Sequence, residues 1–190
     1  MKKINHLSIF MQHRISRLVL LLLLTGSLLF TGMVSTQAVD WQTLLKLTMP
    51  EADKFTQVAD LSKYPSRNFI KMAFPAYKGG TQIGIVFYTA PQGYGGPIHT
   101  LVALDQNGTI SNVNIFSHSE TPAYVQAVNN GSYQRQFAGI SLTDRMAFLI
   151  GTRATKKGEI QAMTGATETS KPLALAVSEA RKLFVEIYPR

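Results

Sequence analysis

Residues 83–116 read IGIVFYTAPQGYGGPIHTLVALDQNGTISNVNIF. Two runs within this stretch, 83–89 and 98–104, are rich in β-branched and aromatic residues, which is typical of strands. Residues 105–108 follow as Asp-Gln-Asn-Gly, and the pair Asn-Gly accepts the positive φ angles that a tight hairpin turn requires. A third strand is expected over 109–116. The stretch therefore predicts an antiparallel β-meander around which the rest of the fold packs.

The third expected strand alternates between two faces, because successive side chains of a strand point to opposite sides of the sheet. The side chains expected on one face are Ile110, Asn112, Asn114 and Phe116, and those expected on the other are Ser111, Val113 and Ile115.

Helical patterns flank the meander. Thr169 to Tyr188 carries apolar residues at three- and four-residue steps, which predicts a helix with one buried face. Thr121-Pro122 predicts an N-cap followed by proline at the first helical position, in a short helix that runs to Val128. Residues 41–61 indicate one or two short helices, and Phe74-Pro75 is expected to be an irregular connection. The fold class is thus α+β: an antiparallel β-meander packed with helices, preceded by an N-terminal hydrophobic helix.

The N-terminal segment is uncharged from Leu18 to Val39 and strongly apolar as far as Val34. Two interpretations are open: a secretory signal cleaved after Thr36-Gln37-Ala38, or a retained anchor, for which about 20 apolar residues suffice. The basic residues of this segment, Lys2, Lys3, Arg14 and Arg17, all precede the apolar run. Such a charge pattern predicts that the chain from Asp40 onward lies on the extracytoplasmic side of the inner membrane. We expect a single-pass membrane protein, or alternatively one released to the periplasm.

Length and composition limit the remaining possibilities. The chain of 190 residues suits a leader at 1–39, a helical lead-in at 40–78 and one principal domain at 79–190. It has no cysteine, which excludes disulfides, thiolate-held zinc and cysteine-ligated iron–sulfur clusters. The 19 basic and 11 acidic residues are scattered, and without a basic stripe interleaved with aromatic residues we expect no nucleic-acid partner.

Residues 163–170, Met-Thr-Gly-Ala-Thr-Glu-Thr-Ser, stand just before the long C-terminal helix. Two interpretations of this segment are open. It forms an N-cap with a tight turn, or it forms an anion site, since the first turn of a helix offers unpaired N–H groups and a partial positive charge. In the second interpretation Thr167 holds a phosphate and Lys171 helps to neutralise it.

Three segments of the chain resemble motifs of one family. Thr164-Gly165-Ala166-Thr167 is similar to the [S/T]-G-A-T flavinylation motif of the FMN-binding domain family. Residues 90–98 resemble that family's A-x-x-G-Y-x-G-x-I segment, and residues 118–122 resemble its H-x-E-T-P segment. The family includes the RnfG subunit of Rnf electron-transport complexes and the NqrC subunit of sodium-translocating NADH:quinone reductases. The likeness extends from Ile83 to Val177 and identifies 79–190 as an FMN-binding domain.

The resemblance implies that a separate flavin transferase joins FMN through its phosphate to Thr167. The expected cofactor-binding residues besides Thr167 are Thr164, Gly165, Ala166, Thr169, Tyr94, Glu120, Thr121 and Tyr124. For Tyr94 two roles are open: covering the flavin ring, or covering the end of the sheet as a turn aromatic. Glu120 and Thr121 are expected either at the polar edge of the flavin or simply at a helix start. The histidines lack metal-ligand spacing, so no metal site is expected.

Two positions depart from the family pattern. Gln161 stands where the family usually has an aspartate, which bears on recognition by the transferase. After the H-x-E-T-P segment the family commonly has Gly-Leu-Gly, whereas this chain has Ala123-Tyr124-Val125. A different pocket wall is therefore expected, with Tyr124 stacked against the flavin ring.

The function expected from the sequence is extracytoplasmic electron transfer by an FMN-carrying subunit of a membrane-bound Rnf/Nqr-like oxidoreductase complex. Such a protein is expected to be an electron-transfer subunit rather than a self-contained enzyme, and its redox chemistry is that of the cofactor. The expected partners are other subunits of the complex, the flavin transferase, and the membrane through the N-terminal segment. Three alternatives are open: a stand-alone exported FMN protein that serves another reductase, a flavin enzyme acting on a small substrate, and a non-covalent flavin-binding module.

Overall fold

In the computed structural model, which describes residues 39–189, five antiparallel strands form the main sheet in the order of the sequence. They are β1 (Lys54–Phe55), β2 (Ile70–Lys78), β3 (Thr81–Thr89), β4 (Ile98–Asp105) and β5 (Ile110–His118). The predicted meander is confirmed as β3, β4 and β5, each hydrogen-bonded to the next. The hydrophobic segment predicted as a signal or anchor lies outside the described residues. Within 39–189 no helix has the length and apolar character needed to cross a membrane.

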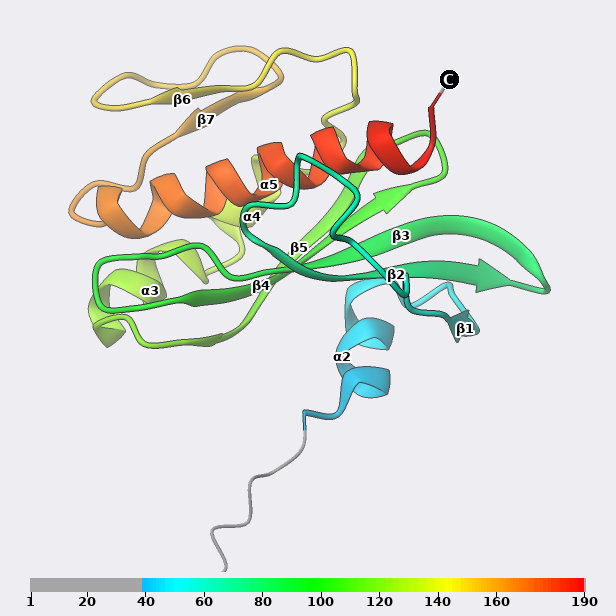
Figure 1. Ribbon diagram of the computed structural model, residues 1–190. Coiled ribbons are helices and arrows are strands. Elements are labelled where there is room, and N and C mark those ends of the chain that lie inside the picture. Colours follow the sequence, from blue (N-terminus) through cyan, green and yellow to red (C-terminus); the bar gives the residue numbers. More distant parts are fainter. Residues whose placement is uncertain (1–38, 190) are drawn as a thin grey trace, which may run out of the picture. The chain divides into compact units, whose positions relative to one another are not determined.

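Helices and a small second sheet surround the meander. The helices are α2 (Trp41–Thr48), α3 (Pro122–Val128), α4 (Ser132–Arg135) and α5 (Thr167–Ile187). The second sheet pairs β6 (Ala147–Leu149) with β7 (Glu159–Gln161) in parallel. Figure 1 shows α5 lying between the main sheet and this two-stranded sheet. The predicted α+β class is therefore confirmed.

Each face of the main sheet is covered by its own hydrophobic core. On one face Ile85, Phe87 and Val102 pack with residues of α5, among them Leu173 and Val177. The core of the opposite face lies under α2; its buried members are Leu45, Met49, Ala52, Phe74, Ala76, Val86, Leu101 and Ala103. The strands β3 and β4 are buried on both faces, which explains why their sequences are nearly continuous apolar runs rather than alternating ones.

The expectation of an irregular connection at Phe74-Pro75 was wrong, because both residues lie inside β2. The carbonyl of Pro75 accepts a hydrogen bond from the N–H of Thr56 at 3.0 Å, on the side of the strand away from β3. In an antiparallel strand the N–H and C=O of one residue point to the same side. The missing N–H of Pro75 would therefore face Thr56, just after β1, and no bond between β2 and β3 is lost.

The expected face of Ile110 was also wrong. Ile110 packs in the same core as Val113 and Ile115, although strict alternation places it opposite them. The pairing of β4 with β5 shifts between Ala103 and Leu104, so that Leu104 pairs with Ile110. An extra residue in one strand turns the following side chains to the other face, and this shift accounts for the change.

Only one helix forms in the segment 41–61. It ends at Thr48, and Met49 leaves the helical region with φ −135° and ψ 78°. The next residue is Pro50, which disfavours helical dihedral angles in the residue before it. The chain then turns into β1, which pairs with Tyr77 and Ala76 at the edge of the sheet.

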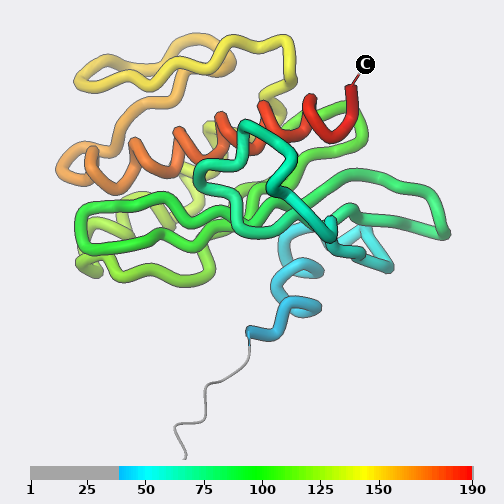
Figure 2. Tube along the Cα trace, in the orientation of Figure 1, coloured from blue at the N-terminus to red at the C-terminus, as the bar shows by residue number. Residues whose placement is uncertain are grey.

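One end of the main sheet brings three separate segments together. The β3–β4 loop, α3 and the start of α5 lie at this end, as the trace in Figure 2 shows. These segments, with the residues that lead into α3 and α5, contain the three sequence motifs that resemble the FMN-binding domain family.

Candidate cofactor site

Thr167 is the first residue of α5 and is half-buried. It is held there by a turn in which the N–H of Ala166 donates to the carbonyl of Met163 at 2.9 Å. Gly165 has φ +77° in this turn, a conformation that side chains other than glycine rarely adopt. Ala166 is the N-cap and is 4% exposed, so its methyl group anchors the turn in the core.

The start of α5 has no side-chain cap, since the N-cap is an alanine. The carbonyl of Ala166 accepts from the N–H groups of Thr169, at 3.2 Å, and Ser170, at 2.9 Å. The N–H groups of Thr167 and Glu168 precede these and have no acceptor within the helix. Together with the partial positive charge of the helix start, they form a place where an anion is stabilised.

The glycine-rich loop between β3 and β4 contributes Tyr94, whose side chain is 73% exposed. The helix α3 contributes Tyr124, which is 38% exposed. The two rings stand nearly perpendicular, at 87°, with their centroids 6.2 Å apart. Neither ring is needed by the core, so both are available to a ligand with a flat aromatic surface.

These residues line a single cleft of about 360 Å³. Its lining residues are Tyr94, Tyr124, Gly165, Ala166, Thr167, Glu168 and Thr169. A volume of this size lies within the range of about 300–1,000 Å³ that is usual for small-molecule sites. The structure thus brings the glycine-rich loop, α3 and the start of α5 to one cleft.

Glu120 lies behind the cleft rather than on its surface, with 5% of the residue exposed. Its Oε1 accepts from the N–H of Gly95 at 2.8 Å, and its Oε2 accepts from the hydroxyl of Thr169 at 2.6 Å. The carboxylate therefore joins the glycine-rich loop to α5. This use was not predictable from the sequence, in which the three residues are far apart.

The other expected site residues take different positions. Thr121 is the N-cap of α3, where its carbonyl accepts from the N–H groups of Tyr124 and Val125. Thr164 is exposed in the turn before α5 and does not line the cleft. Glu168, which does line the cleft, was missed. Its place in the first turn of a predicted helix was the signal that could have revealed it.

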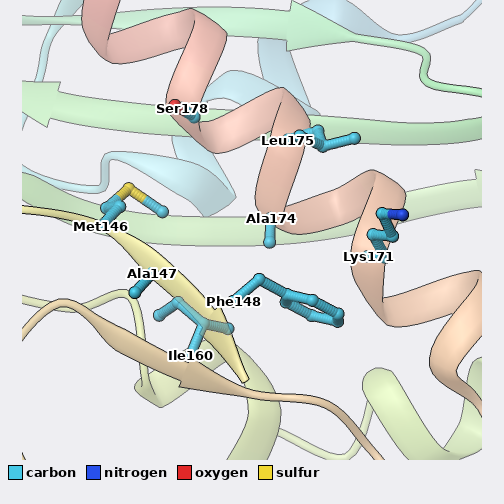
Figure 3. A pocket seen from close by; sticks show the side chains of 8 residues that line it. All are labelled: Met146, Ala147, Phe148, Ile160, Lys171, Ala174, Leu175 and Ser178. Atoms are coloured by element: carbon cyan, nitrogen blue, oxygen red, sulfur yellow. The ribbon is translucent and has the colours of Figure 1, made fainter. Parts of the chain in front are cut away.

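A second cavity, of about 130 Å³, lies on the other side of the start of α5. Figure 3 shows it between α5 and the strands β6 and β7, with Phe148 and Ala174 facing each other across it. Lys171 lines this second cavity and not the cleft of Thr167.

The chemical groups of the first cleft, which contains Thr167, match those of FMN. It combines an anion-binding helix start, a threonine hydroxyl at that start, and two exposed tyrosine rings. The phosphate of FMN matches the unpaired N–H groups, and its flat ring matches the tyrosines. Thr167 would hold the phosphate and Tyr94 and Tyr124 would contact the ring.

Comparison with known proteins agrees with this arrangement. The model of the FMN-binding domain family matches residues 93–182, which include the motifs at 118–122 and 164–167 and most of the one at 90–98. A component of the proton-translocating ferredoxin:NAD(+) oxidoreductase complex of Clostridium ljungdahlii is 35% identical over 136 residues, covering 72% of this chain and 67% of that protein. A component of the Na(+)-translocating ferredoxin:NAD(+) oxidoreductase complex of Acetobacterium woodii is 26% identical over 177 residues, covering 85% and 83%. The cleft, the motifs and these similarities together show that the chain belongs to the FMN-binding domain family.

Proposed function

We propose that this protein carries FMN joined through a phosphoester to Thr167 and transfers electrons as part of a membrane-bound Rnf/Nqr-like oxidoreductase complex. In this proposal the folded part lies on the extracytoplasmic side of the inner membrane. The observation that carries it is the cleft in which Thr167 meets Tyr94 and Tyr124. The relatives named as components of ion-translocating oxidoreductase complexes support the assignment to such a complex.

Different residues of the cleft would bind different parts of the cofactor. The N–H groups at the start of α5 stabilise the single negative charge that a phosphodiester retains. Tyr94 and Tyr124 orient the ring, and the strong exposure of Tyr94 leaves one side of the cleft open to a redox partner. FMN, when bound, supplies the one- and two-electron chemistry. The protein supplies position, electrostatics and access.

The hydroxyl of Thr167 needs an outside enzyme for its modification. A threonine hydroxyl is a weak nucleophile at its ordinary pKa and becomes reactive only beside a general base or an activating group. The cleft residues around Thr167 include Glu168 and two tyrosines but no histidine. A flavin transferase is therefore the proposed maturation partner.

Covalent attachment is tested by co-expressing the full chain with a flavin transferase and measuring its intact mass. The expected result is the mass of one added FMN, with flavin fluorescence on the protein band of a denaturing gel. Thr167→Val should remove both signals. Thr152→Val is the control, because this threonine is exposed and lies outside both the motif and the cleft. Unchanged flavin on Thr167→Val, or a bare polypeptide mass for the unmodified sequence, would refute the attachment.

The role in a complex is tested by purifying the tagged protein from its native membranes. Co-purification with integral-membrane redox subunits is expected. A solitary flavoprotein would instead favour the stand-alone alternative, and turnover of a small acceptor by that solitary protein would favour an enzyme. FMN that binds but separates from the chain on denaturation would favour the non-covalent module.

The location is tested on the same membranes. Protease added to intact inner-membrane vesicles of right-side-out orientation should digest the folded part, because it faces the outside of such vesicles. Protection from the protease would contradict the extracytoplasmic assignment. Alkaline extraction distinguishes a retained anchor, which stays in the pellet, from a cleaved signal, which releases the protein.

A further inference from the structure

Both oxygens of the buried Glu120 carboxylate are engaged by opposite walls of the cofactor cleft. One accepts from the N–H of Gly95, next to Tyr94, and the other from the hydroxyl of Thr169, in the first turn of α5. We propose that Glu120 is a positioning residue, a brace that fixes the distance between the tyrosine wall and the Thr167 wall. The identity of the ligand rests on the proposed function, whereas the brace is a property of the protein alone.

The glycine-rich loop is shaped to receive this carboxylate. A Cβ atom at Gly93 would lie 2.3 Å from Oε1 of Glu120, closer than any side chain tolerates. A Cβ atom at Gly95 would lie 2.5 Å from the carbonyl oxygen of Ser119. The loop therefore presses directly on residues 119–120, and the glycines at 93 and 95 serve this contact. Their role explains part of the glycine-rich motif without any ligand.

The brace also leaves the anion site free. A carboxylate near a helix start usually accepts from backbone N–H groups and caps the helix. Here the N–H of Thr169 is already bonded to the carbonyl of Ala166 at 3.2 Å, and Glu120 meets the side-chain hydroxyl instead. The N–H groups of Thr167 and Glu168 are thus not taken by Glu120. A phosphate and this carboxylate use different donors of the same helix turn.

The first test measures amide hydrogen exchange at Gly95 by NMR in the full chain without flavin. Gly95 is exposed, so protection of its amide derives from the bond to Glu120. Glu120→Ala should accelerate this exchange about tenfold, since one hydrogen bond is lost. Glu120→Gln should retain most of the protection, because the amide oxygen accepts from Gly95. Glu168→Gln is the matched control and should leave the exchange unchanged.

The second test uses the flavin as the reporter of cleft geometry. Tyrosine rings in contact with a flavin quench its emission, so a widened cleft should brighten bound FMN. Glu120→Ala should raise the emission per flavin toward the level of the Tyr94→Ala/Tyr124→Ala double variant. Glu120→Gln should stay near the level of the unmodified sequence. A purely structural role would lower thermal stability in Glu120→Ala and leave the emission of the folded fraction unchanged.

A third variant keeps the proposal testable if Glu120→Ala does not fold. Thr169→Val breaks only the bond to α5, so flavin emission should rise while the Gly95 amide stays protected. Unchanged Gly95 exchange in Glu120→Ala, or unchanged emission in both Glu120→Ala and Thr169→Val, would overturn the brace. If Glu120→Ala loses the protection of the Gly95 amide while the unmodified protein never acquires flavin, the brace is supported and the proposed function is refuted.

Discussion

The substitution Thr169→Val should destabilise the protein markedly, although it conserves volume. Thr169 is 1% exposed, and its hydroxyl donates to the Glu120 carboxylate at 2.6 Å. A hydrogen bond to a charged group contributes about 1.5–3 kcal/mol. The remaining carboxylate oxygen would stay buried without this donor, which adds a desolvation cost. We expect the free energy of unfolding to fall by about 2–3 kcal/mol, near the upper part of that range.

The assay is reversible urea unfolding of the flavin-free protein, supported by thermal scans. For a folded part of this size, such a loss should lower Tm by about 5–10 °C. Thr164→Val is the control, because Thr164 is exposed, and its effect should stay within about 0.5 kcal/mol. A double-mutant cycle with Glu120→Gln isolates the pair, and the coupling energy should be about 1–2 kcal/mol.

Two results would refute this reasoning. If Thr169→Val were as mild as Thr164→Val, the hydroxyl would not be satisfying a buried charge. If the losses from Thr169→Val and Glu120→Gln simply added, the two side chains would not interact in solution as they do in the structure.

Three further predictions concern the scaffold. Gly84→Ala should cost about 3 kcal/mol of stability in urea unfolding, because its Cβ would lie 2.3 Å from the carbonyl oxygen of Leu104 in the paired strand; an unchanged midpoint would contradict this contact. A hydrogen bond from the Ser141 N–H, and next in size one from the Lys157 side chain, lower the pKa of Asp144 from its ordinary 3.8 to about 2. The ionised carboxylate therefore stabilises the fold above about pH 4, and this contribution is lost as the pH falls toward about 2, so Asp144→Asn should flatten the acid limb of Tm against pH. Tyr133→Phe removes the 2.6 Å bond to the carbonyl of Ser170 in α5 and should cost about 0.5–1.5 kcal/mol, and an equal or higher Tm would show that the bond is not made.

The parts of the fold that follow local rules were predictable from the sequence. The strand runs and the Asn107-Gly108 turn indicated the meander, and the apolar periodicity indicated α5. The strand β2 was missed because Pro75 suggests a break, and proline is acceptable there because its missing N–H would point toward Thr56 and not toward β3. The face of Ile110 depends on a register shift against β4, and no local pattern records such a shift.

The candidate site was predictable as a set of segments and not as a geometry. The motif resemblance grouped Tyr94, Tyr124 and Thr167, and the structure places them in one cleft. The burial of Glu120 depends on packing between a loop and a helix that are distant in the chain, so its bracing contacts could not be predicted. Lys171 lines the cavity beside β6 and β7, and this contact was not predictable because it depends on how a distant sheet packs against α5.

The order of the elements, with α5 after all five strands of the main sheet, has a consequence for biosynthesis. Because synthesis proceeds from the N-terminus, all five strands of the main sheet emerge before α5, which contributes Leu173, Val177, Ala180 and Phe184 to the core. Until these residues are synthesised, the apolar side chains on one face of the sheet are exposed to solvent. We therefore expect the nascent polypeptide to need chaperones that prevent its aggregation. A premature stop codon before Leu173 should therefore yield a product that is degraded rather than one that is merely shortened.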